Sequence, residues 1–136
     1  MKKVMWLHGV NHNKFSKREQ KQNGTITLDE INKKVNDLAE ELGIEVTNFQ
    51  TNNEGEFIDK IHEAYLQGYD GVMLNAGAWT HYSHAIGDAL RILECPVIEL
   101  HMSNVHAREE FRHHSVISPI ASGIIVGLGS SVYTLG

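Results

Sequence analysis

Short apolar runs alternate along this chain with segments of helical periodicity, and this alternation restricts its fold more than any other feature. Five runs have the length and composition of strands, at residues 3–7, 45–49, 71–75, 96–100 and 123–126. Three segments between them have apolar residues at helical spacing, at residues 28–42, 54–66 and 84–93. Strands that alternate with helices form a parallel sheet with right-handed crossovers and helices on both faces.

The first of these helices also has clear end signals. Thr27 and Glu30 have the T-x-x-E spacing of a capping box, in which both side chains bind exposed backbone amides. Gly43 follows the last apolar residue of the periodic segment, at the position where helices commonly end. The sequence therefore predicts a helix over residues 28–42.

For five parallel strands, the flavodoxin-like order 2-1-3-4-5 is the expected topology. Ligands of such α/β sheets bind outside the carboxyl ends of the strands, where the strand order reverses between strands 1 and 3. At 136 residues the chain is predicted to form one domain, residues 1–136. The polar stretch at residues 9–24 is long for a connection in a compact domain, and we interpret it as a lid or binding loop.

Charge and composition limit the partners and the compartment. The formal net charge of −5 provides no general basic field, so nucleic acid is not an expected partner. Cys95 is the single cysteine, so no intramolecular disulfide can form, as in proteins of the reducing cytosol. The N-terminal apolar run VMWL is too short for a signal peptide, and no segment approaches the length of a membrane span. We therefore expect a cytoplasmic protein that does not contact a membrane.

Polar side chains follow three of the predicted strands, at the points where the strands end. Strand 1 is followed by Asn11, Asn13 and Arg18, and strand 3 by Asn75, Gly77, Thr80 and His81. Strand 4 ends with or is followed by Glu99, His101, Ser103 and Asn104. In the predicted topology these groups meet in one crevice. Glu99 and His101 alternate along a strand and share a face, so the carboxylate can orient the imidazole as a general acid. Taken singly, Asn75–Gly77 can be only a turn, Glu99 and His101 can be a surface pair, and residues 108–114 can be a solvated charged segment.

Two other kinds of site are less favoured by the sequence. Four histidines lie between residues 101 and 114, yet there is no H-E-x-x-H motif and Cys95 has no cysteine partner. Metal binding is therefore weaker as an interpretation than acid–base or hydrogen-bonding roles. No G-x-G-x-x-G follows the first strand and no P-loop is present, which argues against a dinucleotide or nucleoside triphosphate site.

Two long segments carry a family resemblance. LNAGAWTHYSHAIGDAL (74–90) and PVIELHMSNVHAREEFRHHSVISPIASGIIVGLG (96–129) resemble the type II dehydroquinases, and the similarity covers nearly the whole chain. The resemblance implies a flavodoxin-like fold and a homo-oligomer, a dodecamer built from trimers. It also implies anti elimination of water from 3-dehydroquinate through an enolate, giving 3-dehydroshikimate, without a metal or an organic cofactor.

Matched position by position, the resemblance implies roles in catalysis. His101 is the general acid that protonates the departing hydroxyl, and Glu99 orients it. Asn11 helps to place a water molecule that stabilises the enolate oxygen. Arg18, on the lid, lowers the pKa of the general base, and Arg108 has a supporting role.

The resemblance also implies roles in binding an anionic polyhydroxy substrate. The amides of Met102 and Ser103, with the Ser103 hydroxyl, hold the carboxylate. Asn75 binds the departing hydroxyl, and ring hydroxyls are bound by His81 and Arg112. Asp88 reaches across the trimer interface into a neighbouring site.

The general base departs from the family pattern. The family's first loop reads roughly G-P-N-L-N-L-L-G-x-R-E-P-x-x-Y-G, whereas this chain reads GVNHNKFSKREQKQNG and places Asn23 where the family has its catalytic tyrosine. An asparagine amide does not titrate in a useful range. His12 is the preferred substitute base, since histidine can take a proton at neutral pH, and His8 and Tyr82 are the other candidates. Two further alternatives are a paralogue that acts on a related polyhydroxy keto acid or sugar, and a non-catalytic binding or sensor protein.

Overall fold

The computed structural model describes residues 1–14 and 26–136 and contains a five-stranded parallel sheet. The strand order is β2-β1-β3-β4-β5, so the predicted order 2-1-3-4-5 is confirmed. The strands are β1 (Lys3–His8), β2 (Glu45–Gln50), β3 (Gly71–Asn75), β4 (Val97–His101) and β5 (Gly123–Val126). β1 lies between β2 and β3, and the reversal of strand order falls at its carboxyl end.

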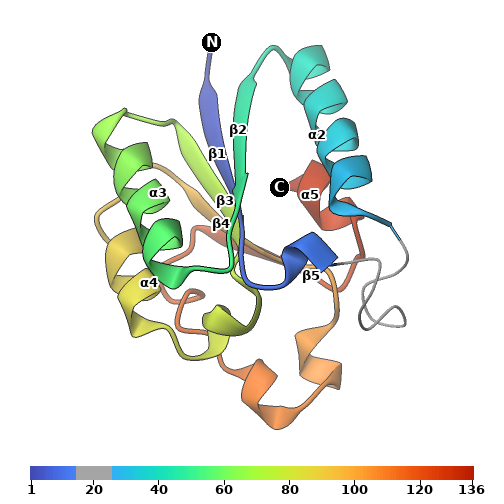
Figure 1. Cartoon of the computed structure of the whole chain (residues 1–136), viewed down its shortest axis with the longest axis vertical. Helices are drawn as coiled ribbons and strands as arrows, with labels where there is room; N and C mark the ends of the chain where they lie inside the picture. Colours follow the sequence, from blue (N-terminus) through green and yellow to red (C-terminus); the bar gives the residue numbers. More distant parts are fainter. Residues whose placement is uncertain (15–25) are drawn as a thin grey trace.

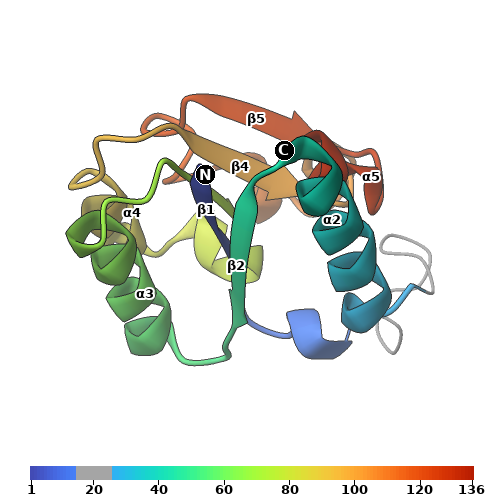
Figure 2. The same ribbon diagram turned by 90° about the horizontal axis from the view of Figure 1, so that it is seen from above.

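Helices cover both faces of the sheet, as Figures 1 and 2 show. α3 (Glu54–Leu66) and α4 (His84–Leu90) pack together on one face, while α2 (Leu28–Leu42) and α5 (Ser131–Leu135) pack on the other. β1 separates two apolar clusters, because its side chains alternate. Met5 and Leu7 contact the α3 and α4 side, and Trp6 contacts the α2 and α5 side.

The Thr27 half of the predicted capping box and the glycine at the end of α2 are as the sequence predicts. The Thr27 hydroxyl accepts a hydrogen bond of 3.2 Å from the backbone amide of Glu30. Gly43 has a φ of 72°, the left-handed conformation that glycine adopts without a steric penalty.

Other boundaries differ by a few residues. α4 ends at Leu90 rather than at 93, and β4 covers Val97–His101 rather than 96–100. The sequence did not predict α5 or the 3-10 turns η1 (His12–Lys14), η2 (Gly77–His81), η3 (Val105–Ala107) and η4 (Glu110–His113). These elements span five residues or fewer, too few for helical periodicity to develop. Most of the predicted lid, residues 15–24 of 9–24, lies outside the described residues. No helix in the described part of the chain is long and apolar enough to cross a membrane.

The loop after β1 lies against the turn after β3 at Gly9. The Gly9 amide donates to the carbonyl oxygen of Asn75, at 2.9 Å, and a Cβ at position 9 would lie 2.5 Å from the carbonyl oxygen of Ala76. Only glycine fits at this distance, so Gly9 allows the two loops to approach closely at the carboxyl edge of the sheet.

A Gly9→Ala variant is expected to lose about 1–3 kcal/mol of unfolding free energy, because its methyl group overlaps backbone that cannot rotate away. Chemical denaturation measures this loss. Gly71→Ala is the matched control, since a Cβ there has its nearest neighbours at 3.9 Å. Equal stability of the two variants would contradict the close packing of the two loops.

Candidate active site

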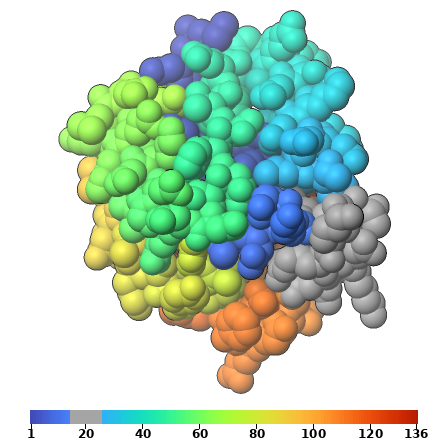
Figure 3. All heavy atoms as spheres, viewed as in Figure 1, coloured from blue at the N-terminus to red at the C-terminus, as the bar shows by residue number. Residues whose placement is uncertain are grey.

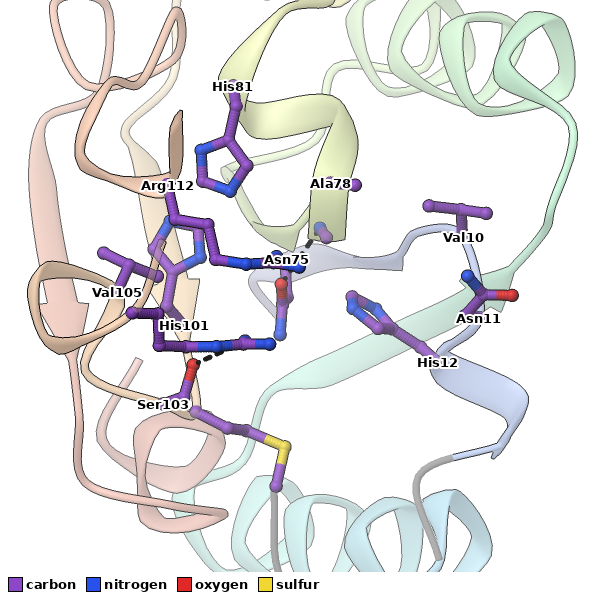
Figure 4. A pocket seen from close by; sticks show the side chains of 13 residues that line it. Val10, Asn11, His12, Asn75, Ala78, His81, His101, Ser103, Val105 and Arg112 are labelled. Carbon is purple, nitrogen blue, oxygen red and sulfur yellow. Dashed lines mark hydrogen bonds between the residues drawn. The ribbon is translucent and has the colours of Figure 1, made fainter. Parts of the chain in front are cut away.

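A pocket opens at the carboxyl edge of the sheet, between the loops that follow β1, β3 and β4 (Figure 4). Its lining residues are Val10, Asn11, His12, Asn75, Gly77, Ala78, His81, His101, Met102, Ser103, Val105, Arg108 and Arg112. In space-filling form, the orange segment that contains η3 and η4 protrudes at the lower end of the molecule, beside this edge (Figure 3). The three loops whose polar residues the sequence placed in one crevice therefore do meet in space.

Glu99 and His101 form a buried pair at the end of β4. Their side chains are 2% and 7% exposed, and the His101 Nε2 atom lies 2.5 Å from the Glu99 Oε2 atom. Because Nε2 is bound to the carboxylate, Nδ1 is the nitrogen with which His101 can exchange a proton with a ligand. This is the arrangement of an oriented acid–base histidine.

Hydrogen bonds keep Glu99 ionised in spite of its burial. Its carboxylate also accepts from the hydroxyls of Ser118 at 2.6 Å and Ser115 at 3.0 Å. Burial acts to raise the pKa of Glu99, but the hydrogen bonds from His101, Ser118 and Ser115 outweigh it and the pKa lies below its ordinary value.

This lowered pKa predicts a pH dependence of stability. At pH values above the ordinary carboxyl pKa, ionised Glu99 makes its full contribution to the free energy of unfolding. This contribution is lost as the pH falls through the lowered pKa that Glu99 has in the folded protein. The difference in unfolding free energy between the native chain and Glu99→Gln is therefore expected to shrink on acidification. Denaturant titrations at several pH values measure it, and a difference that is independent of pH would contradict this prediction.

Asn75 is the last residue of β3, and both polar atoms of its side-chain amide form hydrogen bonds. Its Oδ1 atom accepts from the Gly77 amide at 3.1 Å, and its Nδ2 atom donates to the Tyr133 hydroxyl at 2.9 Å. Tyr133 is 1% exposed, so α5 contributes a buried support for a residue of the pocket. The second Nδ2 hydrogen remains available for a ligand oxygen.

His81 faces the same pocket from the end of η2. Its Nδ1 atom lies 2.8 Å from the backbone carbonyl of His114, so Nδ1 carries the proton and Nε2 is an acceptor in the neutral ring. Burial lowers the pKa of His81, although the bond to the His114 carbonyl partly offsets this. A neutral His81 is suited to accept a hydrogen bond from a ligand hydroxyl.

The charge of the pocket is positive although the chain is acidic. Two arginines, Arg108 and Arg112, line it, and no Asp or Glu does so among the described residues. The Arg108 guanidinium donates to the Ser103 hydroxyl at 3.2 Å. Arg112 is held by Glu109, with 2.5 Å between its Nε atom and the carboxylate. The pocket is therefore suited to bind an anion.

Several predicted site residues lie elsewhere. Asp88 is exposed on α4 and does not line the pocket of its own chain, and its role across a trimer interface stays a prediction. Arg18 and Asn23 lie outside the described residues. His8 is fully buried against Trp6 and Tyr133, and burial lowers its pKa to about 3. Tyr82 is 60% exposed. Neither His8 nor Tyr82 lines the pocket, so the structure does not favour either as a base.

No group of three or more His, Cys, Asp or Glu side chains in residues 1–14 and 26–136 is placed to hold a metal ion. Sequence reasoning missed the contact between Asn75 and Tyr133, because 58 positions separate the two residues and no local pattern connects them.

The fold is that of a flavodoxin-like α/β protein, with a cationic pocket where the strand order of the sheet reverses. A buried Glu–His pair lies at this pocket, together with amide and imidazole groups that can bind the hydroxyls of a ligand. Residues 2–136 match the family model described as dehydroquinase class II, and the chain belongs to that family.

The family's proteins are similar to this chain over its full length. It is 57% identical to the 3-dehydroquinate dehydratase of Syntrophotalea carbinolica, covering 100% of this chain and 92% of that protein. This chain is 54% identical to the 3-dehydroquinate dehydratase of Leptothrix cholodnii, and the match covers 98% of this chain and 89% of that protein. The crystal structure of the type II dehydroquinase from Butyrivibrio crossotus superimposes with a TM-score of 0.96 at 43% identity, covering 98% of this chain and 93% of that one.

Proposed function

We propose that this protein is a hydro-lyase that removes water from 3-dehydroquinate to give 3-dehydroshikimate, in the shikimate pathway. The observation that carries the proposal is the buried Glu99–His101 pair, which faces a cationic pocket lined by hydroxyl-binding side chains. Full-length relatives named 3-dehydroquinate dehydratase support the same substrate.

The pocket supplies groups for each part of this substrate. The substrate carboxylate binds the amides of Met102 and Ser103. The Arg108 guanidinium, which donates to the Ser103 hydroxyl, adds a positive charge beside the carboxylate. His81 and Arg112 bind the ring hydroxyls. The substrate is thereby held with its departing hydroxyl near Asn75 and His101.

The elimination proceeds in two stages. First the C–H bond next to the ketone breaks, the proton goes to a base, and the electron pair moves onto the carbonyl oxygen as an enolate. The enolate then re-forms the ketone, the C–O bond breaks, and His101 protonates the departing hydroxyl so that water leaves. Ionised Glu99 orients His101 and stabilises the positive charge that it carries before the transfer.

The test is turnover of 3-dehydroquinate, followed by the ultraviolet absorbance of the conjugated enone product. Isothermal titration with quinate in parallel separates an enzyme from a binding protein. Asn23, which replaces the family's tyrosine, favours binding without turnover as the second candidate function. Quinate binding without product would support that second candidate and refute the first.

We further propose a single domain over residues 1–136, with the loop at about 9–24 as its lid, in a cytoplasmic homo-oligomer of trimers assembled as a dodecamer. The net charge of −5 supports the absence of nucleic acid among its partners. Asp88, exposed on α4, then completes the site of a neighbouring subunit. Sedimentation measures the assembly, and a monodisperse monomer would refute the shared site.

A further inference from the structure

Tyr133 of α5 packs on the face of the sheet that α2 and α5 cover. Side chains alternate along β3, so Asn75 shares this face with Met73, which lies in the same apolar cluster as Tyr133. The Nδ2 atom of Asn75 therefore meets the Tyr133 hydroxyl, to which it donates at 2.9 Å. Tyr133 does not line the pocket, so its effect on a ligand passes through Asn75, which does.

The surroundings of the Tyr133 hydroxyl keep it neutral and away from water. Its ring lies beside those of Trp6 and His8, with centroids 5.4 and 5.6 Å away. Burial raises the pKa of the phenol, and burial also lowers the pKa of His8, so the neighbouring imidazole is neutral at neutral pH. Because solvent does not reach this depth, no water replaces the phenol oxygen as the acceptor for Asn75 if the hydroxyl is removed.

Gly77 and Tyr133 together fix the orientation of the Asn75 amide. The Gly77 N–H can only donate, so the atom that faces it at 3.1 Å is Oδ1 and not Nδ2. Tyr133 accepts one of the two Nδ2 hydrogens. The amide cannot rotate without losing both bonds, and its second Nδ2 hydrogen is left for a ligand in the pocket that Asn75 lines (Figure 4).

We propose that Tyr133 is a positioning residue for the reaction: by holding the Nδ2 atom of Asn75, it directs the remaining N–H toward the departing hydroxyl of the substrate. This inference rests on the proposed function, in which Asn75 binds that hydroxyl. Tyr133 touches no substrate atom and transfers no proton. An amide that is already oriented needs no rearrangement when the hydroxyl binds or when the C–O bond breaks.

A double-mutant cycle separates this positioning role from a structural one. Quinate keeps the hydroxyl that leaves 3-dehydroquinate, so its Kd, measured by isothermal titration, reports on the Asn75 contact. Tyr133→Phe removes one hydroxyl and is expected to weaken quinate binding by about 2–10-fold. In the Asn75→Ala background the same change is expected to leave the Kd within about twofold. An equal weakening in both backgrounds, or none in either, would overturn the positioning role.

Tyr69→Phe is the matched control. Tyr69 comes just before β3, at the opposite end of that strand from Asn75, and its hydroxyl donates to the Thr47 hydroxyl at 3.0 Å. This variant also loses one internal hydrogen bond of a tyrosine, yet its Kd for quinate is expected to equal that of the native chain. A loss as large as that of Tyr133→Phe would show a general effect of stability and would refute the proposal.

Proton–nitrogen NMR of the Asn75 side chain reads the contact without ligand or turnover. One of the two Nδ2 hydrogen signals is expected to move upfield in Tyr133→Phe, because its hydrogen bond is lost, and to stay in place in Tyr69→Phe. Signals that are unchanged in Tyr133→Phe would overturn the proposal. If the native chain binds quinate but forms no product, the dehydratase function fails, while the cycle and the NMR signals still decide the role of Tyr133.

Discussion

A His101→Gln variant is expected to convert 3-dehydroquinate about 10²–10⁴-fold more slowly than the native protein, with KM changed little. The departing hydroxide is a poor leaving group and needs a proton as the C–O bond breaks. Glutamine can donate a hydrogen bond from a similar position, but it cannot give up a proton. The loss should therefore fall on kcat, which initial-rate measurements over a range of substrate concentrations determine.

His62→Gln is the control for this experiment, because His62 lies exposed on α3 and does not line the pocket. Circular dichroism and quinate titration of His101→Gln show whether the fold and the binding site are retained. A kcat within about tenfold of the native value would contradict the general-acid role of His101. Loss of quinate binding would instead place His101 in substrate binding.

The strands and long helices could be predicted from the sequence because they depend on local patterns. α2 matched its expected bounds since Thr27 and Gly43 mark both ends and its apolar face repeats at helical spacing. The pocket could also be anticipated, because parallel strands in a known order bring their carboxyl ends together. Its location needed only the sheet topology.

Other parts of the site depend on contacts that no local pattern encodes. His12 was expected as a base from its residue type, whereas its Nδ1 atom accepts a hydrogen bond from the Gly9 amide. The direction of that bond follows from the path of the backbone in η1, which is too short to have a periodicity. Tyr133 supports Asn75 from the far end of the chain, and only the packing of α5 on the sheet brings the two together.

An Asn23→Tyr variant is expected to raise kcat for 3-dehydroquinate by about 10²–10⁴-fold over the native chain, which is the usual contribution of a positioned base. Position 23 lies outside the described residues. The Nδ1 atom of His12 accepts from the Gly9 amide, and neither His8 nor Tyr82 lines the pocket, so a tyrosine at position 23 would supply a base that none of these three side chains is placed to provide. A tyrosinate can accept the substrate proton, which an asparagine amide cannot do in a useful pH range.

Asn23→Phe is the matched control, because it supplies the ring of tyrosine without the group that ionises. The gain in Asn23→Tyr should be absent in Asn23→Phe and should increase with pH as the phenol ionises. A native chain that already works at the rate of Asn23→Tyr would show that another group removes the proton. His12→Gln then decides whether that group is His12, since glutamine cannot accept the substrate proton. Equal rates in His12→Gln and the native chain would show that His12 is not the base.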